Sequence, residues 1–317
     1  MRIVIPDDYQ DAVRHLACFS MLADHQVTVY HDHTEDLETL VSRFQEADAL
    51  VLIRERTPIT EALLARLPAL KLIVQTGKQA PHLDLDACTR HGVTVAFSEG
   101  GGNPASTAEL TWGLILASRR HIPQEVAYLK AGRWQTTIGI GLSGQTLGIF
   151  GYGRIGSIVA NYGRAFGMRV LVWGREHSLE QARIDGFEPA ASQDALFQQA
   201  DVLSLHLKLV KETRGIVTAA HLAQMKPSAL FVNTSRAALV EPGALVAALA
   251  AGRPGYAAVD VYEREPALDH PLLHMENVVC TPHLGYVEKD TYEGYFASAF
   301  EQVRAFTEDR PIRRANP

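Results

Sequence analysis

The amino-acid sequence predicts an α/β protein with two doubly wound parallel sheets. Short runs rich in Val, Ile and Leu alternate with amphipathic stretches, and the runs fall into two series, within residues 2–97 and 146–281. A glycine-rich turn, "GIFGYGRIG" at 148–156, follows the first run of the second series. Each series is long enough to form a sheet of its own, so we expect two domains.

The expected elements follow from hydrophobic periodicity and from helix-boundary residues. In the segment 34–47, Thr34 precedes apolar residues on one helical face, and the segment 242–252 has Pro near its start and Gly at its end. We expect strands at 2–5, 26–30, 49–53, 70–74, 93–97, 146–151, 169–173, 201–207, 229–233, 256–262 and 277–281. Further helices are expected at 103–120, 154–167 and 290–309. The last of these has no strand after it, so we expect it to return to the first domain.

Composition excludes several classes of function. The chain has 317 residues, of which 47% are hydrophobic and 21% charged, and its net charge of −6 argues against a nucleic-acid partner. The start "MRIVIPDDYQ" is a short apolar strand followed by acids, so no signal peptide or membrane span is expected. The three cysteines lie far apart without C-x-x-C spacing, so we expect neither a disulfide nor a metal site. These features predict a cytoplasmic protein.

The glycine turn predicts a dinucleotide site. Gly151, Gly153 and Gly156 form a G-x-G-x-x-G pattern between a strand and a helix. The first two glycines allow a tight turn close to a pyrophosphate, and the helix N-terminus offers N–H donors. A turn of this kind also occurs for packing alone, but the flanking strands and helix favour binding. The sequence thus predicts a Rossmann domain at 101–287, inserted into a flavodoxin-like substrate domain at 1–100 and 288–317.

Three polar residues follow successive expected strands of the second sheet. They are Arg236, Glu265 and His283. A guanidinium can bind a carboxylate in a fork and polarise the neighbouring carbonyl. An imidazolium can protonate the developing alkoxide, and a carboxylate beside it orients the ring. Each residue alone is more often structural, but their joint position at one sheet edge favours the chemistry of 2-oxo acid reduction.

Five segments, "LGIFGYGRIG", "DVLSLHLKLVKETRGIV", "MKPSALFVNTSRAALV", "GYAAVDVYEREP" and "NVVCTPHLG", stand in this order in the chain. With them the sequence resembles the D-isomer-specific 2-hydroxyacid dehydrogenases along nearly its whole length. The resemblance implies an NAD(P)-dependent oxidoreductase acting on a small D-2-hydroxy acid or 2-oxo acid, with Arg236, Glu265 and His283 as its catalytic residues. The implied cofactor-binding residues are Gly151, Tyr152, Gly153, Arg154, Ile155, Gly156, Gly174, Arg175, His206, Thr213, Thr234 and Asp260, the last at the nicotinamide carboxamide.

The sequence departs from the family pattern at two places in the cofactor region. Lys208 stands where the family usually has proline. After the strand "RVLVW" the chain has Gly174 and Arg175 instead of the acid that accepts hydrogen bonds from the adenosine ribose. The cofactor is therefore NAD(H) or NADP(H), and the small residue followed by arginine favours NADP(H). Glu176 can pair with Arg175 and so oppose phosphate binding, which leaves NAD(H) open.

The resemblance also implies substrate-binding residues and an oligomeric state. The family's carboxylate-binding loop falls on "QTGKQA", around Gly77 and Lys78, and the resemblance implies that Arg236 also contacts substrate. In "LIRERTPIT", Arg54 and Arg56 resemble the paired arginines of phosphoglycerate dehydrogenases, although a solvated loop paired with Glu55 is an equal alternative. Family members are commonly dimers, and the apolar residues in "EVAYLKAGRWQTT" (125–137) suit a homodimer contact.

Two other functions remain open at this point. One is a dinucleotide-sensing binding protein, like the corepressors built on this fold, although no recruitment segment is recognisable. The other is a formate dehydrogenase of the same fold, which the resemblance disfavours because those enzymes have glutamine where Glu265 stands.

Overall fold

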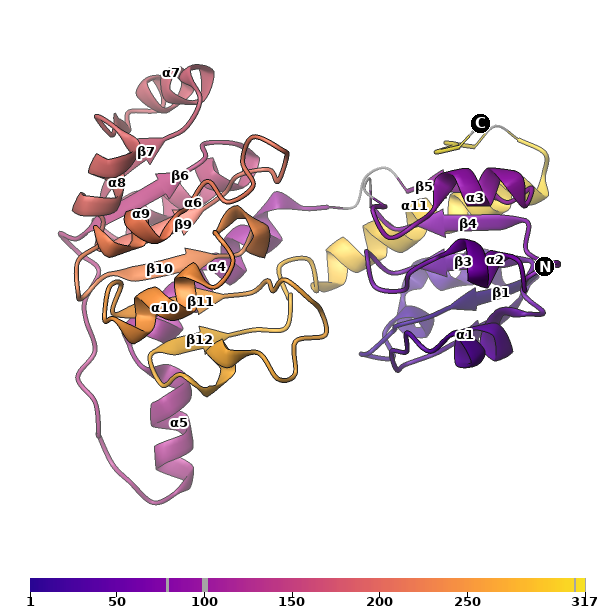
Figure 1. Cartoon of the computed structure of the whole chain (residues 1–317), viewed down its shortest axis with the longest axis horizontal. Helices are drawn as coiled ribbons and strands as arrows, with labels where there is room; N and C mark the ends of the chain where they lie inside the picture. Colours follow the sequence, from indigo (N-terminus) through magenta and orange to yellow (C-terminus); the bar gives the residue numbers. More distant parts are fainter. Residues whose placement is uncertain (78–79, 99–101, 311, 317) are drawn as a thin grey trace. The chain divides into compact units, whose positions relative to one another are not determined.

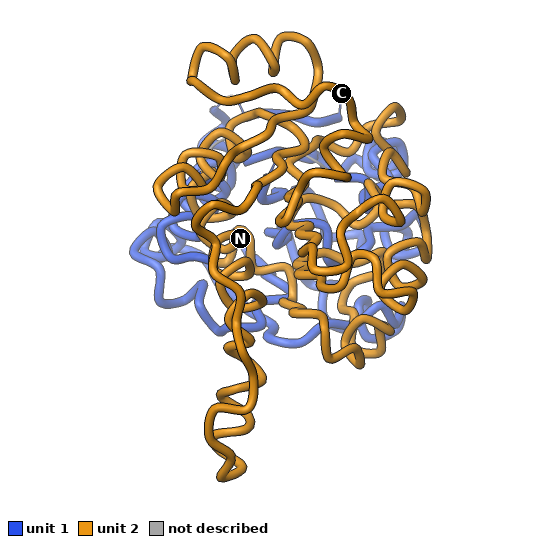
Figure 2. The backbone as a smooth tube through the Cα atoms, turned by 90° about the vertical axis from the view of Figure 1, so that its left-hand side faces the viewer, with its two compact units in different colours: residues 1–103, 288–317 blue, residues 104–287 orange. Residues whose placement is uncertain are grey.

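The structure is a computed structural model that describes residues 1–77, 80–98, 102–310 and 312–316. The chain divides into two compact units, residues 1–103 with 288–317 (unit 1) and residues 104–287 (unit 2) (Figure 2). Each unit is built around its own parallel sheet. We find, among the described residues, no helix with the length and apolar character that crossing a bilayer requires.

Unit 1 contains a five-stranded parallel sheet in the order β2-β1-β3-β4-β5 (Figure 1). Its strands are β1 (Arg2–Ile5), β2 (Gln26–Val29), β3 (Ala49–Leu52), β4 (Leu72–Gln75) and β5 (Thr94–Phe97). All residues of β3 and β4 are buried, as expected of central strands in a sheet that is covered on both faces. This strand order is that of the flavodoxin-like doubly wound sheets.

Helices cover both faces of the five-stranded sheet. They are η1 (Val13–His15), η2 (Ala17–Leu22), α1 (Leu37–Phe44), α2 (Glu61–Leu64), α3 (Leu85–Arg90) and α11 (Lys289–Thr307). On one face, apolar side chains of α1, α2 and α3 form a core with alternate residues of the strands, such as Leu50 and Leu52. The C-terminal helix α11 belongs to the same unit and contacts η2, β4 and β5.

Unit 2 contains a seven-stranded parallel sheet in the order β12-β11-β10-β9-β6-β7-β8 (Figure 1). Its strands are β6 (Thr146–Phe150), β7 (Arg169–Trp173), β8 (Glu188–Pro189), β9 (Val202–Leu205), β10 (Leu230–Asn233), β11 (Tyr256–Val259) and β12 (Val278–Cys280). The chain order reverses between β6 and β9, which is where open α/β sheets bind ligands. The two sheets confirm the predicted pair of doubly wound parallel sheets.

Successive side chains along the strands of unit 2 point to opposite faces of the sheet, so the core of this unit has two layers. In β10, Leu230 and Val232 pack with α4 and α6, whereas Phe231 faces α8, α9 and α10. The helices of unit 2 are α4 (Pro104–Arg119), α5 (Ile122–Lys130), α6 (Arg154–Ala165), α7 (Glu176–Ile184), α8 (Gln193–Gln199), α9 (Ala219–Ala223), η3 (Ala237–Leu239), α10 (Ala244–Ala250) and η4 (Pro271–His274).

Element boundaries differ from the sequence predictions where side chains cap the helices. Helix α1 begins at Leu37, because the carboxylate of Asp36 accepts a 2.9 Å hydrogen bond from the Thr39 amide and caps the helix. The predicted start at Thr34 was three residues early, and the Thr34 hydroxyl instead accepts from the Asp36 amide. The two-residue edge strand β8 was not predicted, because it is too short to show a period.

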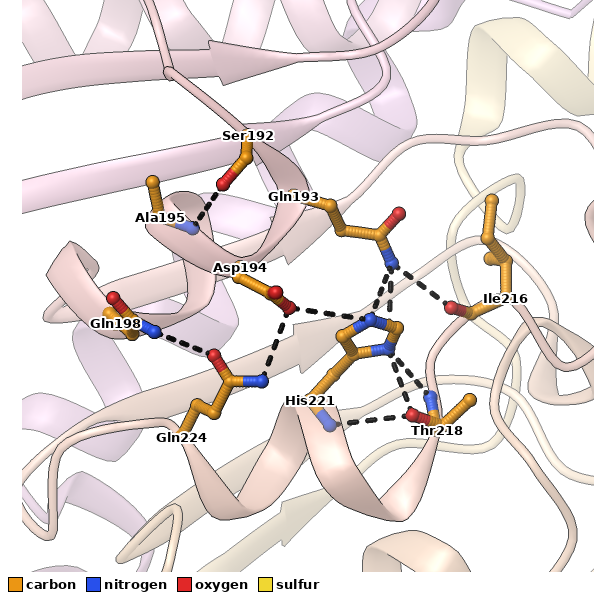
Figure 3. Close-up of polar contacts among 9 residues, drawn as sticks. All are labelled: Ser192, Gln193, Asp194, Ala195, Gln198, Ile216, Thr218, His221 and Gln224. Atoms are coloured by element: carbon orange, nitrogen blue, oxygen red, sulfur yellow. Dashed lines mark hydrogen bonds and ion pairs between the residues drawn. The ribbon is translucent and has the colours of Figure 1, made fainter.

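A polar network connects α8 to the segment before α9 (Figure 3). Gln193 donates to the carbonyl of Ile216 at 3.1 Å and lies 3.3 Å from Nε2 of His221. Nδ1 of His221 accepts a 3.1 Å hydrogen bond from the Thr218 amide, and its other nitrogen lies 3.7 Å from Asp194. The network fixes the end of the long connection that begins where β9 ends.

Candidate active site

Every residue predicted in unit 2 for cofactor binding or catalysis lies after a strand of the parallel sheet. These strands are β6, β7, β9, β10, β11 and β12. Because the sheet is parallel, the segments that follow these strands meet at one edge. The carboxyl edge of the seven-stranded sheet is therefore the candidate active site.

The glycine turn between β6 and α6 has the geometry of a phosphate cradle. Gly151 has φ +100°, and a Cβ there would lie 2.6 Å from the carbonyl oxygen of His206, so only glycine fits. A Cβ on Gly156 would collide with the carbonyl of Gly151. Within the described part of the chain, a Cβ at Gly153 would meet nothing within 4 Å, and no side chain caps the helix that begins at Arg154. The N–H groups of the first turn, including that of Ile155, are thus available to an anion.

His206 follows β9 beside this turn and has an unpaired nitrogen. Its Nε2 lies 2.9 Å from the Ser204 hydroxyl, whereas Nδ1 is buried and has no hydrogen-bond partner among the described residues. Burial lowers the pKa of His206 to about 3, so the ring is neutral near pH 7. A buried polar atom without a partner is costly, and a bound ligand that supplies the partner removes that cost. His206 therefore fits a cofactor contact.

The segment after β7 has room for a larger residue at Gly174. A Cβ there would lie 3.6 Å from Cβ of Ser178 and 3.8 Å from Cα of Gly151, which are ordinary contacts. Arg175 is exposed at the N-terminus of α7. Glu176 forms its ion pair with Arg183 at 3.1 Å, so the expected alternative of an Arg175–Glu176 pair does not occur.

The loop after β10 holds Arg236 in place through neighbouring side chains. The Asn233 amide donates to the carbonyl of Arg236 at 3.0 Å and its oxygen accepts from the Ser235 amide at 3.0 Å. The Ser235 hydroxyl in turn donates to the carbonyl of Leu205 at 2.8 Å, which joins the loop to β9. The Arg236 guanidinium is half-buried and lies close enough to lower the pKa of Glu265.

Glu265 and His283 form a hydrogen-bonded pair. Oε2 of Glu265 lies 2.7 Å from Nδ1 of His283, and Oε1 accepts a 3.0 Å hydrogen bond from the Tyr262 amide. Burial alone would raise the pKa of Glu265, but His283, Tyr262 and Arg236 together outweigh it and hold this pKa below its usual value. Glu265 is thus ionised near pH 7. Since Nδ1 is engaged, Nε2 of His283 is the nitrogen available to a substrate.

Asp260 holds the loop that carries His283. Its carboxylate is fully buried and accepts hydrogen bonds from the Thr281 hydroxyl at 2.6 Å, the Leu284 amide at 2.7 Å and the Gly285 amide at 2.9 Å. Burial raises the pKa of Asp260, although these donors and His283 oppose the effect. His283 has φ +54°, an uncommon conformation for a residue other than glycine, and it lies between the residues that Asp260 binds.

Three residues predicted to bind cofactor have their hydroxyl groups in protein contacts. The Tyr152 hydroxyl donates to Asp185 at 2.6 Å, and the ring packs edge-on against Phe187. Thr234 pairs with the Thr111 hydroxyl of α4 at 2.8 Å. The Thr213 hydroxyl lies 2.7 Å from the carbonyl of Lys208. These contacts use the hydroxyl protons, and each hydroxyl oxygen can still accept a hydrogen bond.

Helix α4 contributes to the site, which was not predicted from the sequence. The Ser106 and Thr107 hydroxyls both donate to the carbonyl of Gly285, at 3.0 and 2.8 Å, and so fix the end of the His283 loop from a second direction. The signal in the sequence was the run of small polar residues in "NPASTAEL", at the start of a helix that is otherwise apolar.

The predicted substrate residues of unit 1 lie at the carboxyl edge of the five-stranded sheet. Arg54 has φ +55°, and its amide donates to the Thr76 hydroxyl at 2.9 Å. A Cβ on Gly77 would collide with the Arg54 guanidinium, so the two residues are in close contact. The Gly77 amide, expected to bind a substrate carboxylate, donates to the Ser98 hydroxyl at 3.0 Å. Lys78 lies outside the described residues.

Comparison with known proteins gives a family match. The model of the D-isomer specific 2-hydroxyacid dehydrogenase NAD-binding domain matches residues 112–285. The chain is 38% identical to a glyoxylate reductase from Aeropyrum pernix, over 86% of this chain and 84% of the relative. It is 37% identical to a D-3-phosphoglycerate dehydrogenase from Bacillus subtilis over 84% of this chain, but it spans only 51% of that relative's length.

Solved structures of similar proteins cover nearly the whole chain or all of it. A protein from Ralstonia solanacearum, assigned provisionally as a D-3-phosphoglycerate dehydrogenase, has 55% identity and a TM-score of 0.96, covering 100% of this chain and 97% of its own. A phosphoglycerate oxidoreductase from Vibrio cholerae has 53% identity and a TM-score of 0.93, covering 98% of this chain and 99% of its own.

Proposed function

The chain belongs to the D-isomer specific 2-hydroxyacid dehydrogenase family, and we propose that Arg236, Glu265 and His283 carry its reaction. A dehydrogenase of this family transfers a hydride between a nicotinamide cofactor and a small 2-hydroxy or 2-oxo acid. The observation that supports the three roles is the 2.7 Å contact between Glu265 and Nδ1 of His283, with the Arg236 guanidinium in electrostatic range of the carboxylate.

The three side chains have complementary tasks in this proposal. Arg236 binds the substrate carboxylate and polarises the adjacent carbonyl. Nε2 of His283 donates the proton to the carbonyl oxygen during reduction and accepts it during oxidation. Glu265 orients the ring and compensates the positive charge of the imidazolium. Asp260 and the α4 hydroxyls keep the His283 loop in position, so they act through His283 and not on the substrate.

The glycine turn fits a dinucleotide cofactor. The uncapped N-terminus of α6, the open space at Gly153 and the unpaired Nδ1 of His206 support this site. A bound nicotinamide cofactor supplies or accepts the hydride. We infer that NADP(H) is preferred, because exposed Arg175 stands beside Gly174 where an acid would repel a 2′-phosphate, and Glu176 pairs with Arg183.

For the substrate we infer a small 2-oxo acid with a second anionic group. Arg54 and Arg56 both follow β3, and the Arg54 guanidinium contacts the backbone at Gly77. Arg54 also forms an ion pair with Glu55 at 3.6 Å, which was the alternative expected from the sequence. The distance between the charged atoms of this pair is long. The side chains of Arg54 and Glu55 are only 16% and 23% exposed, so this loop is not an ordinary solvated one.

We further propose that the chain forms a homodimer through α5 and the segment that follows it. None of the α5 residues is buried, and exposed fractions reach 57% at Leu129, 74% at Trp134 and 93% at Ile138. The segment after α5 is nonetheless held against this helix, because Glu125 accepts hydrogen bonds from the hydroxyls of Thr136 and Thr137, both at 2.7 Å. An ordered apolar surface of this kind is typical of a subunit contact. Light scattering on the wild type and on a Trp134→Ser variant tests it, and a monomeric wild type would contradict it.

Turnover with a substrate panel tests the proposed reaction. We expect the protein to oxidise NADPH or NADH in the presence of glyoxylate, hydroxypyruvate, pyruvate or 2-oxoglutarate. A matched titration measures cofactor affinity without substrate. Cofactor binding without turnover on any 2-oxo acid would favour the dinucleotide-sensing alternative over the enzyme.

A further inference from the structure

An ion pair with one fully buried partner lies at the carboxyl edge of the five-stranded sheet and has no part in the proposed proton transfer. Asp7 follows β1 and is 1% exposed, and one of its carboxylate oxygens lies 2.9 Å from Nδ1 of His33, which follows β2. The other carboxylate oxygen accepts a 2.5 Å hydrogen bond from the hydroxyl of Thr57, which follows β3. Asp7 thereby joins the loops after three neighbouring strands.

The backbone of Asp7 provides one of the contacts that hold Arg56. Asp7 has φ +64°, a left-handed conformation that residues other than glycine seldom adopt, and its side-chain contacts hold it there. Its carbonyl oxygen accepts a 2.5 Å hydrogen bond from Nη1 of Arg56. The centre of that guanidinium also lies 4.4 Å from the centroid of the Tyr9 ring. A change in the Asp7 carboxylate contacts is therefore transmitted to Arg56 through one peptide group.

The charge state of His33 changes the net charge of this cluster. The hydrogen bond to Asp7 raises the pKa of His33 more than burial lowers it, and Glu35, 3.8 Å from Nε2, acts in the same direction as Asp7. His33 therefore compensates Asp7 at low pH, and this compensation is lost as pH rises through the raised pKa. Other charged or titratable groups surround the pair. Asp8 is the next residue along the chain and is fully buried, and His31 pairs with Asp11 at 3.6 Å in the same loops. Asp7, Arg54 and Glu55 act on the buried His82, and Tyr292 of α11 hydrogen-bonds to Arg56 and is acted on by Asp8 and Arg54.

We propose that His33 and Asp7 form a positioning pair that holds Arg56 and sets how strongly this sheet edge binds the anionic tail of a substrate. The proposal rests on the proposed function, since it takes Arg54 and Arg56 to bind that tail. With His33 protonated, the Asp7 charge is compensated and the guanidinium groups act on the substrate. When His33 loses its proton, the uncompensated carboxylate beside Arg56 weakens the attraction for an anion.

Two variants of His33 separate its hydrogen bond from its charge. His33→Asn keeps an N–H donor for Asp7 but cannot be charged, whereas His33→Leu removes both. Steady-state kinetics are measured across the neutral pH range with two substrates. 2-Oxoglutarate has a second carboxylate, whereas glyoxylate has only the carboxylate next to its carbonyl. In the wild type, we expect the KM for 2-oxoglutarate to rise about three- to tenfold with pH as His33 deprotonates.

The expected pattern is specific to the tail. For 2-oxoglutarate, His33→Asn is expected to show at every pH the KM that the wild type has at high pH, and His33→Leu is expected to show a still higher KM. The kcat and the KM for glyoxylate stay within about twofold of the wild type in both variants. Equal changes for both substrates, or no change, would overturn the proposal, because a general loss of structure affects both alike.

Matched variants keep the test decisive. His31→Leu alters the same loop, but His31 contacts the carbonyl of Asp8 at 3.2 Å and not the Asp7 carboxylate, so the substrate preference is expected to persist. If His33→Leu does not fold, Thr57→Val removes the other hydrogen bond to Asp7 and is expected to raise the KM for 2-oxoglutarate.

The outcomes also distinguish this proposal from the proposed function. A wild type that turns over none of glyoxylate, hydroxypyruvate, pyruvate and 2-oxoglutarate refutes the reaction itself. A wild type that reduces both without preferring 2-oxoglutarate refutes the tail site and, with it, the positioning pair. A preference that persists unchanged in the His33 and Thr57 variants refutes the positioning pair alone.

Discussion

Replacing Gly174 by Asp is expected to move cofactor preference from NADPH toward NADH. The structure accommodates the new side chain, since a Cβ at this position meets its nearest neighbour, Cβ of Ser178, at 3.6 Å. The carboxylate restores the acceptor for the ribose hydroxyls and repels a 2′-phosphate. At about 5 Å in bulk water, a carboxylate and a doubly charged phosphate repel by about 1.7 kcal/mol, which is about 15-fold in Kd.

Arg175→Ala is expected to act on the same phosphate. A hydrogen bond to a charged group contributes about 1.5–3 kcal/mol, and the exposure of Arg175 places it near the lower end, about tenfold in the Kd for NADPH. The Kd for NADH is expected to change little. Together the two substitutions shift the ratio of the Kd values by about 3 kcal/mol, or more than 100-fold.

Fluorescence titration of each variant with NADPH and NADH measures these ratios directly. Arg169→Ala is the matched control, because Arg169 also carries one positive charge but begins β7 at its amino end, where it pairs with Glu188 at 2.6 Å. Its ratio is expected to equal that of the wild type. A wild type with a lower Kd for NADH than for NADPH would contradict the proposed NADP(H) preference, and the missing acid would then be merely tolerated.

The remaining predictions concern the reaction and its substrate. His283→Ala is expected to lower kcat by about 10²–10⁴-fold, the usual contribution of general acid–base catalysis, and near-normal turnover would remove the proposed mechanism. Glu265→Gln is expected to move the limb of the pH–rate profile that reports the general acid to lower pH, because the imidazolium loses its neighbouring charge; an unmoved limb would contradict the pairing. Asp260→Asn leaves one backbone N–H of the His283 loop without its acceptor and is expected to lower kcat about tenfold with little change in cofactor Kd, which a direct nicotinamide contact would alter instead. Arg54→Ala is expected to abolish any advantage that 2-oxoglutarate has over glyoxylate in catalytic efficiency, measured as kcat/KM, and equal losses on both substrates would place Arg54 outside the tail site.

The position of the candidate site followed from residue order, but its internal contacts did not. A polar residue after a parallel strand must lie at the carboxyl edge of the sheet, so Arg236 and His283 could be placed from strand positions alone. The role of Asp260 could not, because its three donors come from residues 21 to 25 positions later in the chain. The hydroxyls of α4 act on Gly285 from almost 180 positions earlier, beyond the reach of local patterns.

The chain order of apolar runs, glycines and polar residues determined the two parallel sheets, the glycine turn and the sheet edge that bears the candidate catalytic residues. Periodicity and glycine geometry are local properties, and each can be read over a few residues. The polar partners of individual side chains depended on the tertiary structure. Glu176 forms an ion pair with Arg183 instead of Arg175, the Tyr152 hydroxyl donates to Asp185, and the Gly77 amide donates to the Ser98 hydroxyl. A side chain's partner depends on which loops converge after folding, and a polar group finds that partner because remaining buried without one is costly.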